Sequence, residues 1–307
     1  MKQMNQLQQN KKSREIWLSV RKNKMAMAGM ITLTIFILIA IFGPILVPFS
    51  TQEFGGVADI MQPPGGKHLL GTDDMGRDVL ANLMAGARIS LLIGGVATII
   101  SMAIGTLVGI SAGYFGGVVD NVLMRLTDFF LVIPWLPLMM VLAAVLGTSV
   151  WNIILVIGIT SWAGTARVVR AQTLSVKERQ FVERTLSLGA GNWHIMWRHI
   201  LPNVFPLVFA NTVLIAATAI TSETTLSFLG LGDTTTASWG MMLHYAFECG
   251  ATGLGAYWYY LPPGICVIAV VLAFTLLGYA FDEILNPKLK ERQGYEIIRS
   301  KELKDLF

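Results

Sequence analysis

The sequence predicts an all-α, polytopic membrane protein with six transmembrane helices. Three observations predict it: a low charged fraction, six long apolar runs, and basic residues concentrated in alternate loops. Of the 307 residues, 54% are hydrophobic and 14% are charged, whereas about a quarter of the residues in a soluble domain are charged. The net charge of +4 is explained by basic cytoplasmic loops, so it predicts a lipid bilayer and no nucleic acid as the partner.

Each of the six runs lacks Asp, Glu, Lys and Arg and approaches the ~20 residues needed to cross a hydrocarbon core. The third and fourth runs are short and are separated by a turn at 147–149, and Pro134 and Pro137 predict a kink in the third. The first run is too long for the core of a signal peptide and no cleavage pattern follows it, which predicts an uncleaved anchor. The runs are 26–47, 90–114, 129–146, 150–166, 202–221 and 261–281.

Lys and Arg indicate the orientation. With the N-terminus inside, 20 of the 23 Lys and Arg residues fall in cytoplasmic segments and 3 fall in the first external loop. Cytoplasmic loops of membrane proteins carry such an excess, so both termini are predicted to be cytoplasmic. The chain then divides into a cytoplasmic tail (1–25), a first transmembrane helix (26–47), an external loop with an amphipathic helix (48–89), a five-helix core (90–281) that contains the cytoplasmic loop 167–201, and a cytoplasmic tail (282–307).

The cytoplasmic loop 167–201 has the pattern of two short helices joined by a turn. Gly189 and Gly191 interrupt a stretch of apolar residues at helical spacing, and Asn192 is the predicted N-cap of the second helix. Pro202 then occupies the first turn of the fifth span. An isolated amphipathic loop would rest on the lipid surface. The two glycines and the short second helix favour instead a projecting elbow that docks a soluble partner by helix-in-groove packing.

The external segment before the second span carries the string GTDDMGRD. Thr72 or Asp73 is predicted to cap a helix whose first turn holds Asp73 and Asp74. Asp73 can pair with Arg77, and an exposed pair of this kind contributes about 0.3–0.5 kcal/mol. Two interpretations stay open, a helix that only anchors the second span at the interface and a motif with a specific role. The motif residues are Gly71, Thr72, Asp73, Gly76, Arg77 and Asp78.

The cytoplasmic loop resembles the EAA loop of ABC-importer permeases. In those permeases Glu-Ala-Ala is followed, after fixed gaps, by a glycine and then by an apolar residue, any residue and Leu-Pro. Here Gly189 lies six residues after Glu183, and Leu201-Pro202 begins twelve residues after Gly189. The external segment 68–95 is similar to the one that enters the second span in the dipeptide/oligopeptide branch of these permeases. The segments 113–134, 222–232, 238–243 and 261–290 resemble the same branch.

Three positions depart from the family's pattern. Arg184 and Thr185 stand in place of the two alanines, which suggests a partner groove with room or negative charge opposite that face. His199 takes the apolar position, and Ile200 follows it.

The resemblance covers about residues 17–290 and implies a MetI-like, type I permease of the dipeptide/oligopeptide/nickel family, of the kind that serves as the second permease subunit. It implies a second homologous permease, two ABC ATPase subunits or domains and an extracytoplasmic binding protein as partners, in the cytoplasmic membrane of a prokaryote. ATP and Mg would be bound by the ATPase subunits, so no cofactor is expected in this chain. The residues that the resemblance assigns to the ATPase-coupling loop are Phe181, Glu183, Arg184, Thr185, Gly189, Gly191, Ile200, Leu201 and Pro202.

The residues themselves favour a motor outside this chain. No GxxxxGK[ST] phosphate loop occurs, and the six runs offer no ionisable group for a proton or ion circuit. No enzyme or metal site is predicted, and Cys249 and Cys266 are expected to be ordinary thiols. Short peptides are the predicted substrate class, with nickel, a metal chelate or another small solute as the alternative within the family. An autonomous ion-coupled carrier or a channel is the alternative outside it. No substrate-binding residue is assigned.

Overall fold

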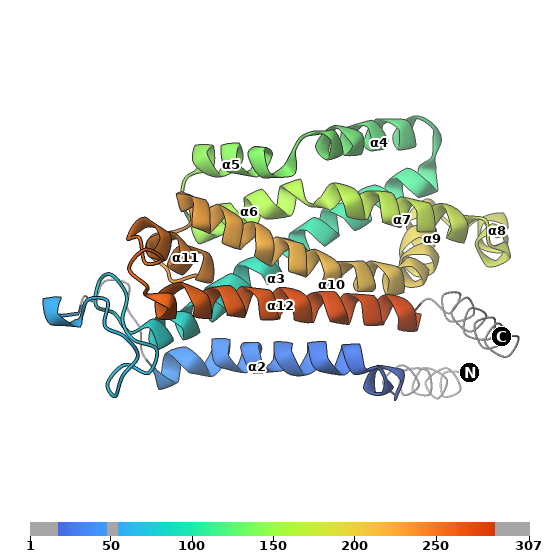
Figure 1. Cartoon of the computed structure of the whole chain (residues 1–307). Helices are drawn as coiled ribbons and strands as arrows, with labels where there is room; N and C mark the ends of the chain where they lie inside the picture. The colour runs from blue at the N-terminus through green and yellow to red at the C-terminus, as the bar shows by residue number, and fades with distance from the viewer. Residues whose placement is uncertain (1–17, 48–54, 286–307) are drawn as a thin grey trace, which may run out of the picture.

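The computed structural model describes residues 18–47 and 55–285, and over these ranges the chain is a bundle of helices without a β-strand (Figure 1). The predicted all-α fold is confirmed. Most of the predicted tails, 1–17 and 286–307, lies outside the described residues. The helices are α2 (Lys24–Leu46), α3 (Val79–Phe115), α4 (Gly117–Val132), α5 (Trp135–Leu146), α6 (Val150–Thr160), α7 (Trp162–Lys177), α8 (Gln180–Ser187), α9 (Asn192–Ile195), α10 (Leu201–Leu226), α11 (Trp239–Glu248) and α12 (Tyr257–Leu285).

Within the described ranges, five helical segments are long and apolar enough to cross a membrane, and a sixth results when the bent pair α4–α5 counts as one span. α4 and α5 meet at 90°. Pro134 is the residue just before α5, where its ring prevents α4 from continuing. The bounds predicted for the third span, 129–146, are wrong, because α4 already begins at Gly117. The predicted kink at proline is confirmed.

Two spans are longer than their apolar runs. α3 begins at Val79 rather than at residue 90 and extends over 37 residues, so the amphipathic helix predicted for the external loop is the first part of α3. At the other boundary, α10 extends past residue 221 to Leu226 and therefore contains Glu223. The prediction that the spans hold no carboxylate is wrong, because a carboxylate whose partners lie inside the protein does not end a helix.

A row of glycines on α3 forms its contact with α7. A Cβ atom added at Gly105 would lie 2.8 Å from the carbonyl oxygen of Trp162, and one at Gly109 would lie 2.6 Å from that of Ala166. Small residues one turn apart let two membrane helices approach to backbone contact, where van der Waals packing replaces the hydrophobic driving force that is absent in lipid. α7 packs in this way along the C-terminal half of α3.

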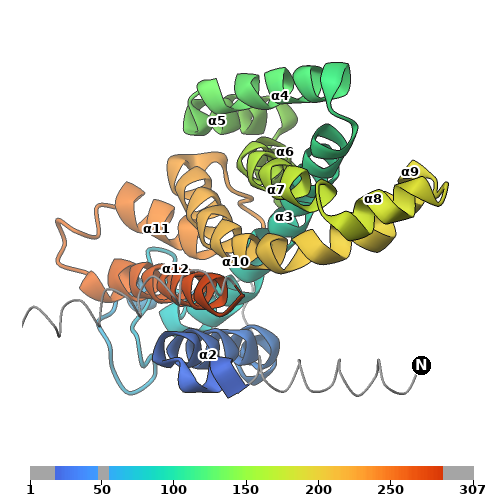
Figure 2. The same cartoon turned by 90° about the vertical axis from the view of Figure 1, so that its right-hand side faces the viewer.

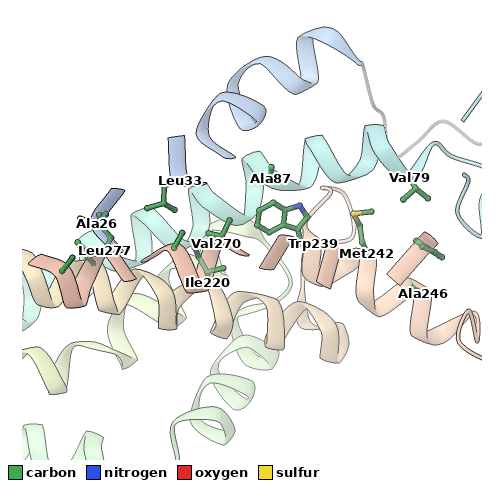
Figure 3. Packing of buried hydrophobic residues seen from close by; sticks show 14 of the residues in the cluster. Ala26, Leu33, Val79, Ala87, Ile220, Trp239, Met242, Ala246, Val270 and Leu277 are labelled. Atoms are coloured by element: carbon green, nitrogen blue, oxygen red, sulfur yellow. The ribbon is translucent and has the colours of Figure 1, made fainter. Parts of the chain in front are cut away.

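The largest apolar cluster lies toward the other end of α3. It joins α2, α3, α11 and α12, and Trp239 at the start of α11 is fully buried in it. Figure 3 shows the Trp239 ring beside Ala87 of α3. Its indole N–H donates to the carbonyl oxygen of Leu83 over 3.0 Å, which satisfies the polar end of a ring that is otherwise surrounded by apolar groups.

The glycine contact predicts the effect of adding one methyl group. Gly109→Ala places that methyl against the backbone of α7 and should lower the free energy of unfolding by about 1–3 kcal/mol, the usual cost of overpacking. Unfolding by sodium dodecyl sulfate in a mild detergent, followed by circular dichroism, measures the difference.

Gly95 on the same helix is the matched control, because a Cβ atom there meets no neighbouring atom within 4 Å. Gly95→Ala should leave stability unchanged or raise it by about 0.5–1 kcal/mol through the better helix propensity of alanine. Equal losses of unfolding free energy in the two variants would contradict the close contact between α3 and α7.

Candidate functional site

The predicted helix–turn–helix lies at one end of the bundle, beyond the end of α7 (Figure 1). We call residues 178–202 the elbow and this end of the bundle the elbow end. Figure 2 views the molecule from this end and shows α8 and α9 projecting to one side of the other helices. α9 continues through a π-helical segment, Met196–Ile200, directly into α10. The second part of the elbow, from Asn192 onward, is therefore the beginning of a helix that is long and apolar enough to span a membrane.

The turn of the elbow is built around Gly189, which has a φ of +79°. In this left-handed conformation its N–H donates to the carbonyl oxygen of Leu186 (2.9 Å), and the next N–H, of Ala190, donates to that of Thr185 (3.3 Å). Both bonds satisfy carbonyl groups at the end of α8, as glycine-centred helix ends commonly do. Gly191, rather than Asn192, precedes α9, so the predicted N-cap is wrong.

The inner face of the elbow is seated on the ends of α3 and α7. Val182, Ile195 and Ile200 are buried in one apolar cluster with residues of both helices, including Tyr114. The Tyr114 hydroxyl donates to Oδ1 of Asn192 over 2.8 Å. The Lys177 ammonium donates to the Tyr114 carbonyl oxygen over 2.6 Å. Because these contacts come from both sides of the turn, the elbow is fixed relative to the helices beneath it.

The outer face of the elbow is exposed and partly apolar. Leu188 is 87% exposed and Trp193 is 69% exposed, and Phe181, Glu183 and Arg184 also reach the surface. Clustered exposed apolar side chains with charged neighbours are typical of a protein-docking surface. A groove of about 550 Å³ between α3, α7 and α8, lined by Val182, Glu183 and Leu186 among others, adjoins this face.

The three residues that depart from the family's pattern differ in their surroundings. Arg184 is exposed on the outer face, and the Thr185 hydroxyl donates to the carbonyl oxygen of Phe181, one turn back. The His199 ring packs 6.2 Å from the Phe181 ring and 5.6 Å from that of His194. His199 thus takes the place of an apolar side chain by packing against rings. Leu201 is half-buried and Pro202 is exposed at the start of α10.

The GTDDMGRD motif lies at the opposite end of the bundle, where it forms a compact turn before α3 (Figure 1). We call residues 55–78 the cap. Asp73 is fully buried, and its carboxylate accepts hydrogen bonds from the N–H groups of Met75 (2.9 Å) and Arg77 (2.8 Å) and from Nε of Arg77 (2.7 Å). The predicted pairing of Asp73 with Arg77 is confirmed, but the pair is buried in a turn before α3 and is not exposed within a helix. Burial raises the pKa of Asp73, and the hydrogen bonds and the charge of Arg77 oppose this shift.

Glycines and an N-cap explain why the motif turns rather than forming a helix. Gly71 and Gly76 have φ values of +70° and +73°, which side chains other than glycine rarely adopt. Asp78, and not Thr72 or Asp73, caps the helix, since its Oδ1 accepts the N–H of Ala81 over 2.9 Å.

The cap also joins α3 to α12. The indole N–H of Trp258 donates to the carbonyl oxygen of Thr72 over 3.2 Å, and the Tyr259 hydroxyl donates to Oδ1 of Asp74 over 2.8 Å. The motif thus fastens the first turns of two spans to each other, which is more than anchoring one helix at an interface.

The sequence analysis missed one further buried group. Glu223 of α10 is fully buried, and its carboxylate accepts hydrogen bonds from Ser90 of α3 (3.2 Å) and from Ser227 (2.9 Å). Because Glu223 lies just beyond the run 202–221, it was assigned to the start of an external loop. The signal that could have located it is the serine-rich string SETTLSF around it, because buried carboxylates need hydrogen-bond donors.

Comparisons with known proteins agree with this architecture. Residues 105–291 match the family model described as "Binding-protein-dependent transport system inner membrane component", and residues 12–64 match the "N-terminal TM domain of oligopeptide transport permease C". The chain belongs to this family of ABC-importer permeases. It is not itself an ATPase by family, since permeases are the non-catalytic subunits of such importers.

The permease is similar to several curated relatives over nearly its whole length. It is 35% identical to the dipeptide transport system permease protein DppC of Bacillus subtilis (91% of this chain, 86% of the relative) and 35% identical to the oligopeptide transport system permease protein OppC of the same organism (92% and 93%). It is 35% identical to the glutathione transport system permease protein GsiD of Escherichia coli (90% and 90%).

A solved structure shares the fold. A chain of the MetNI methionine ABC transporter in an inward-facing conformation aligns with a TM-score of 0.52 and 16% identity, covering 66% of this permease and 94% of that chain. At this identity the likeness supports the MetI-like fold alone.

The ion pairs of Asp73 and Asp128 differ in burial, so removing each aspartate is predicted to lower the free energy of unfolding by a different amount. Asp73→Ala should destabilise the permease by about 3–5 kcal/mol, because the Arg77 guanidinium stays buried without this carboxylate. Asp128→Ala removes the partner of Arg167 in a pair in which both side chains are 55% exposed, and it should cost less than about 1 kcal/mol. Detergent unfolding of both variants measures this difference, and equal losses would contradict a structural role for the cap.

Proposed function

We propose that this permease forms half of the translocation pathway of an ATP-driven importer of short peptides, and that its elbow docks an ABC ATPase subunit. The observation that carries the proposal is the elbow itself. Its outer face is exposed, its inner face packs on α3 and α7, and its second helix continues without interruption into α10. The substrate class is supported by the relatives, whose names specify dipeptide, oligopeptide and glutathione transport.

The other components follow from what this chain lacks and from its charge distribution. Since the sequence has no phosphate-binding loop, ATP and Mg would be bound by two separate ATPase subunits or domains. A second, homologous permease would complete the pathway, and an extracytoplasmic binding protein would deliver the peptide. The elbow end would face the cytoplasm, because 20 of the 23 Lys and Arg residues lie in the segments predicted to be inside.

The coupling mechanism follows from the elbow residues. Phe181, Glu183 and Arg184 on the outer face would contact the ATPase, and the turn at Gly189 would hold α8 and α9 at a fixed angle. Closure of the ATPase subunits would then displace the elbow as a rigid body. Because Ile200 and Leu201 join α9 to α10 within one helical run, the displacement would pass directly to the span.

A substitution at the turn tests the coupling role. Gly189→Val forces a β-branched residue into a left-handed conformation, at a cost of about 1–2 kcal/mol, and should abolish ATPase assembly or peptide uptake while leaving membrane insertion intact. Gly164→Val is the control, because Gly164 is an exposed residue of α7 outside the elbow, does not have a positive φ and has open space around its Cβ position. Normal substrate-coupled uptake by the Gly189 variant would refute the coupling role.

Reconstitution tests the proposed function as a whole. The permease, co-expressed with the proteins encoded beside it, should co-purify with an ATPase and a second permease. In proteoliposomes the complex should accumulate a labelled dipeptide or oligopeptide only when ATP and the binding protein are both supplied. Uptake by the permease alone, driven by an ion gradient, would contradict the proposal. Uptake of nickel or a metal chelate in place of peptides would contradict the substrate class only.

A further inference from the structure

We propose that Glu223 is a positioning residue that fastens α11 to the α3–α10 pair, so that a displacement of the elbow reaches α11. This inference rests on the proposed function, in which the elbow receives an ATPase. It assigns a role in coupling to a buried carboxylate at the end of the bundle opposite the elbow.

Four hydroxyl groups converge on the Glu223 carboxylate. The Ser90 hydroxyl of α3 donates to Oε2 over 3.2 Å, and the Ser227 hydroxyl, from the π-helical segment that follows α10, donates to Oε1 over 2.9 Å. Ser238, the N-cap residue of α11, and Thr224 also hydrogen-bond to the carboxylate. Hydrogen bonds to an ionisable acceptor in an apolar interior are among the stronger ones, so this one side chain links α3, α10 and α11.

Two of these hydroxyls also accept hydrogen bonds from the backbone of α11. The N–H of Trp239 donates to Oγ of Ser90 over 3.2 Å, and the N–H of Met241 donates to Oγ of Ser238 over 3.2 Å. Both N–H groups belong to the first turn of α11, where a helix lacks internal acceptors. The proton of each hydroxyl is then directed to Glu223, while its oxygen accepts from α11.

Close packing around the carboxylate leaves little room for α11 to slide. A Cβ atom at Gly240 would lie 2.5 Å from Cβ of Ser227, and one at Gly86 would lie 3.0 Å from the Trp239 ring. Packed interfaces of this kind are held in discrete arrangements rather than deformed continuously. α11 should therefore move together with the helices that contact it.

A continuous helical run connects this cluster to the elbow. The helical run that begins at residue 192 in the elbow passes Glu223 and is broken beyond it, at Gly230, whose φ is +82°. Figure 1 shows α9 and α11 at opposite ends of the bundle with α10 between them. Glu223 is thus the point at which the helix that begins in the elbow is bonded to α11.

Glu223→Gln in the reconstituted complex tests the proposal, because it keeps the side-chain volume and replaces one accepting oxygen by a donor. Peptide uptake per ATP hydrolysed should fall about tenfold, within the range typical of a lost coupling interaction, while complex assembly and the ATPase rate are retained. Hydrogen exchange in the segment 233–247 should become faster. Glu248→Gln, the same substitution at an exposed carboxylate of α11, is the control and should change neither quantity.

Two results would overturn the proposal. One is unchanged uptake per ATP, and the other is a parallel loss of uptake and ATPase rate, which would indicate a general defect of the complex. If the Gln variant fails to assemble, Ser227→Ala and Ser90→Ala remove single partners of the carboxylate and should each lower uptake per ATP to a smaller extent. A wild-type complex that transports no peptide would refute the proposed function, and a wild-type complex that transports while every variant matches it would refute only the role of Glu223.

Discussion

The absence of water from the hydrocarbon core is the constraint on which this structure depends, because every polar group there must find its partner inside the protein. Several hydroxyls within the spans meet it locally: that of Thr98 donates to the carbonyl oxygen of Gly94 one turn back, whereas those of Ser101 and Thr106 are buried without a hydrogen-bond partner. Glu223 meets it through serines brought from other elements. Where helices need to touch without polar groups, as α3 and α7 do, glycines bring their backbones together.

These contacts hold the helices together at both ends of the permease, and long helices connect the two ends. At the elbow end, the Tyr114–Asn192 hydrogen bond and the buried apolar cluster hold the elbow against α3 and α7. At the other end, the cap links the starts of α3 and α12, and the cluster around Glu223 links α11 to α3 and α10. Under the proposed function, a subunit built in this way would carry a displacement of the elbow to α10 and α11, which suits a permease whose energy source lies in a separate ATPase.

The sequence predicted the all-α fold and the elbow because both depend on local signals, namely uncharged runs and glycines at helical breaks. It failed where tertiary contacts decide the conformation. The turn at Asp73 requires Gly71 to pack against Trp258, which is far away in the sequence. Glu223 was placed outside its span because a hydropathy criterion stops at a charged residue and cannot anticipate Ser90. The start of α3 at Val79 depends on Asp78 acting as the cap, a choice among several acidic residues that only the fold of the cap resolves.

The most direct measurement of the central claim is the distance between the elbow and α11 during the transport cycle. Spin labels at Trp193→Cys and Phe247→Cys, both exposed positions, would be placed in a complex in which Cys249 and Cys266 are replaced by serine. Pulsed electron paramagnetic resonance would then compare the nucleotide-free and ATP-trapped states. A rigid connection predicts the same distance distribution within the permease in both states, while the distance from Phe247 to a label on the second permease changes. A distance within the chain that changes with nucleotide would contradict transmission through a rigid helix.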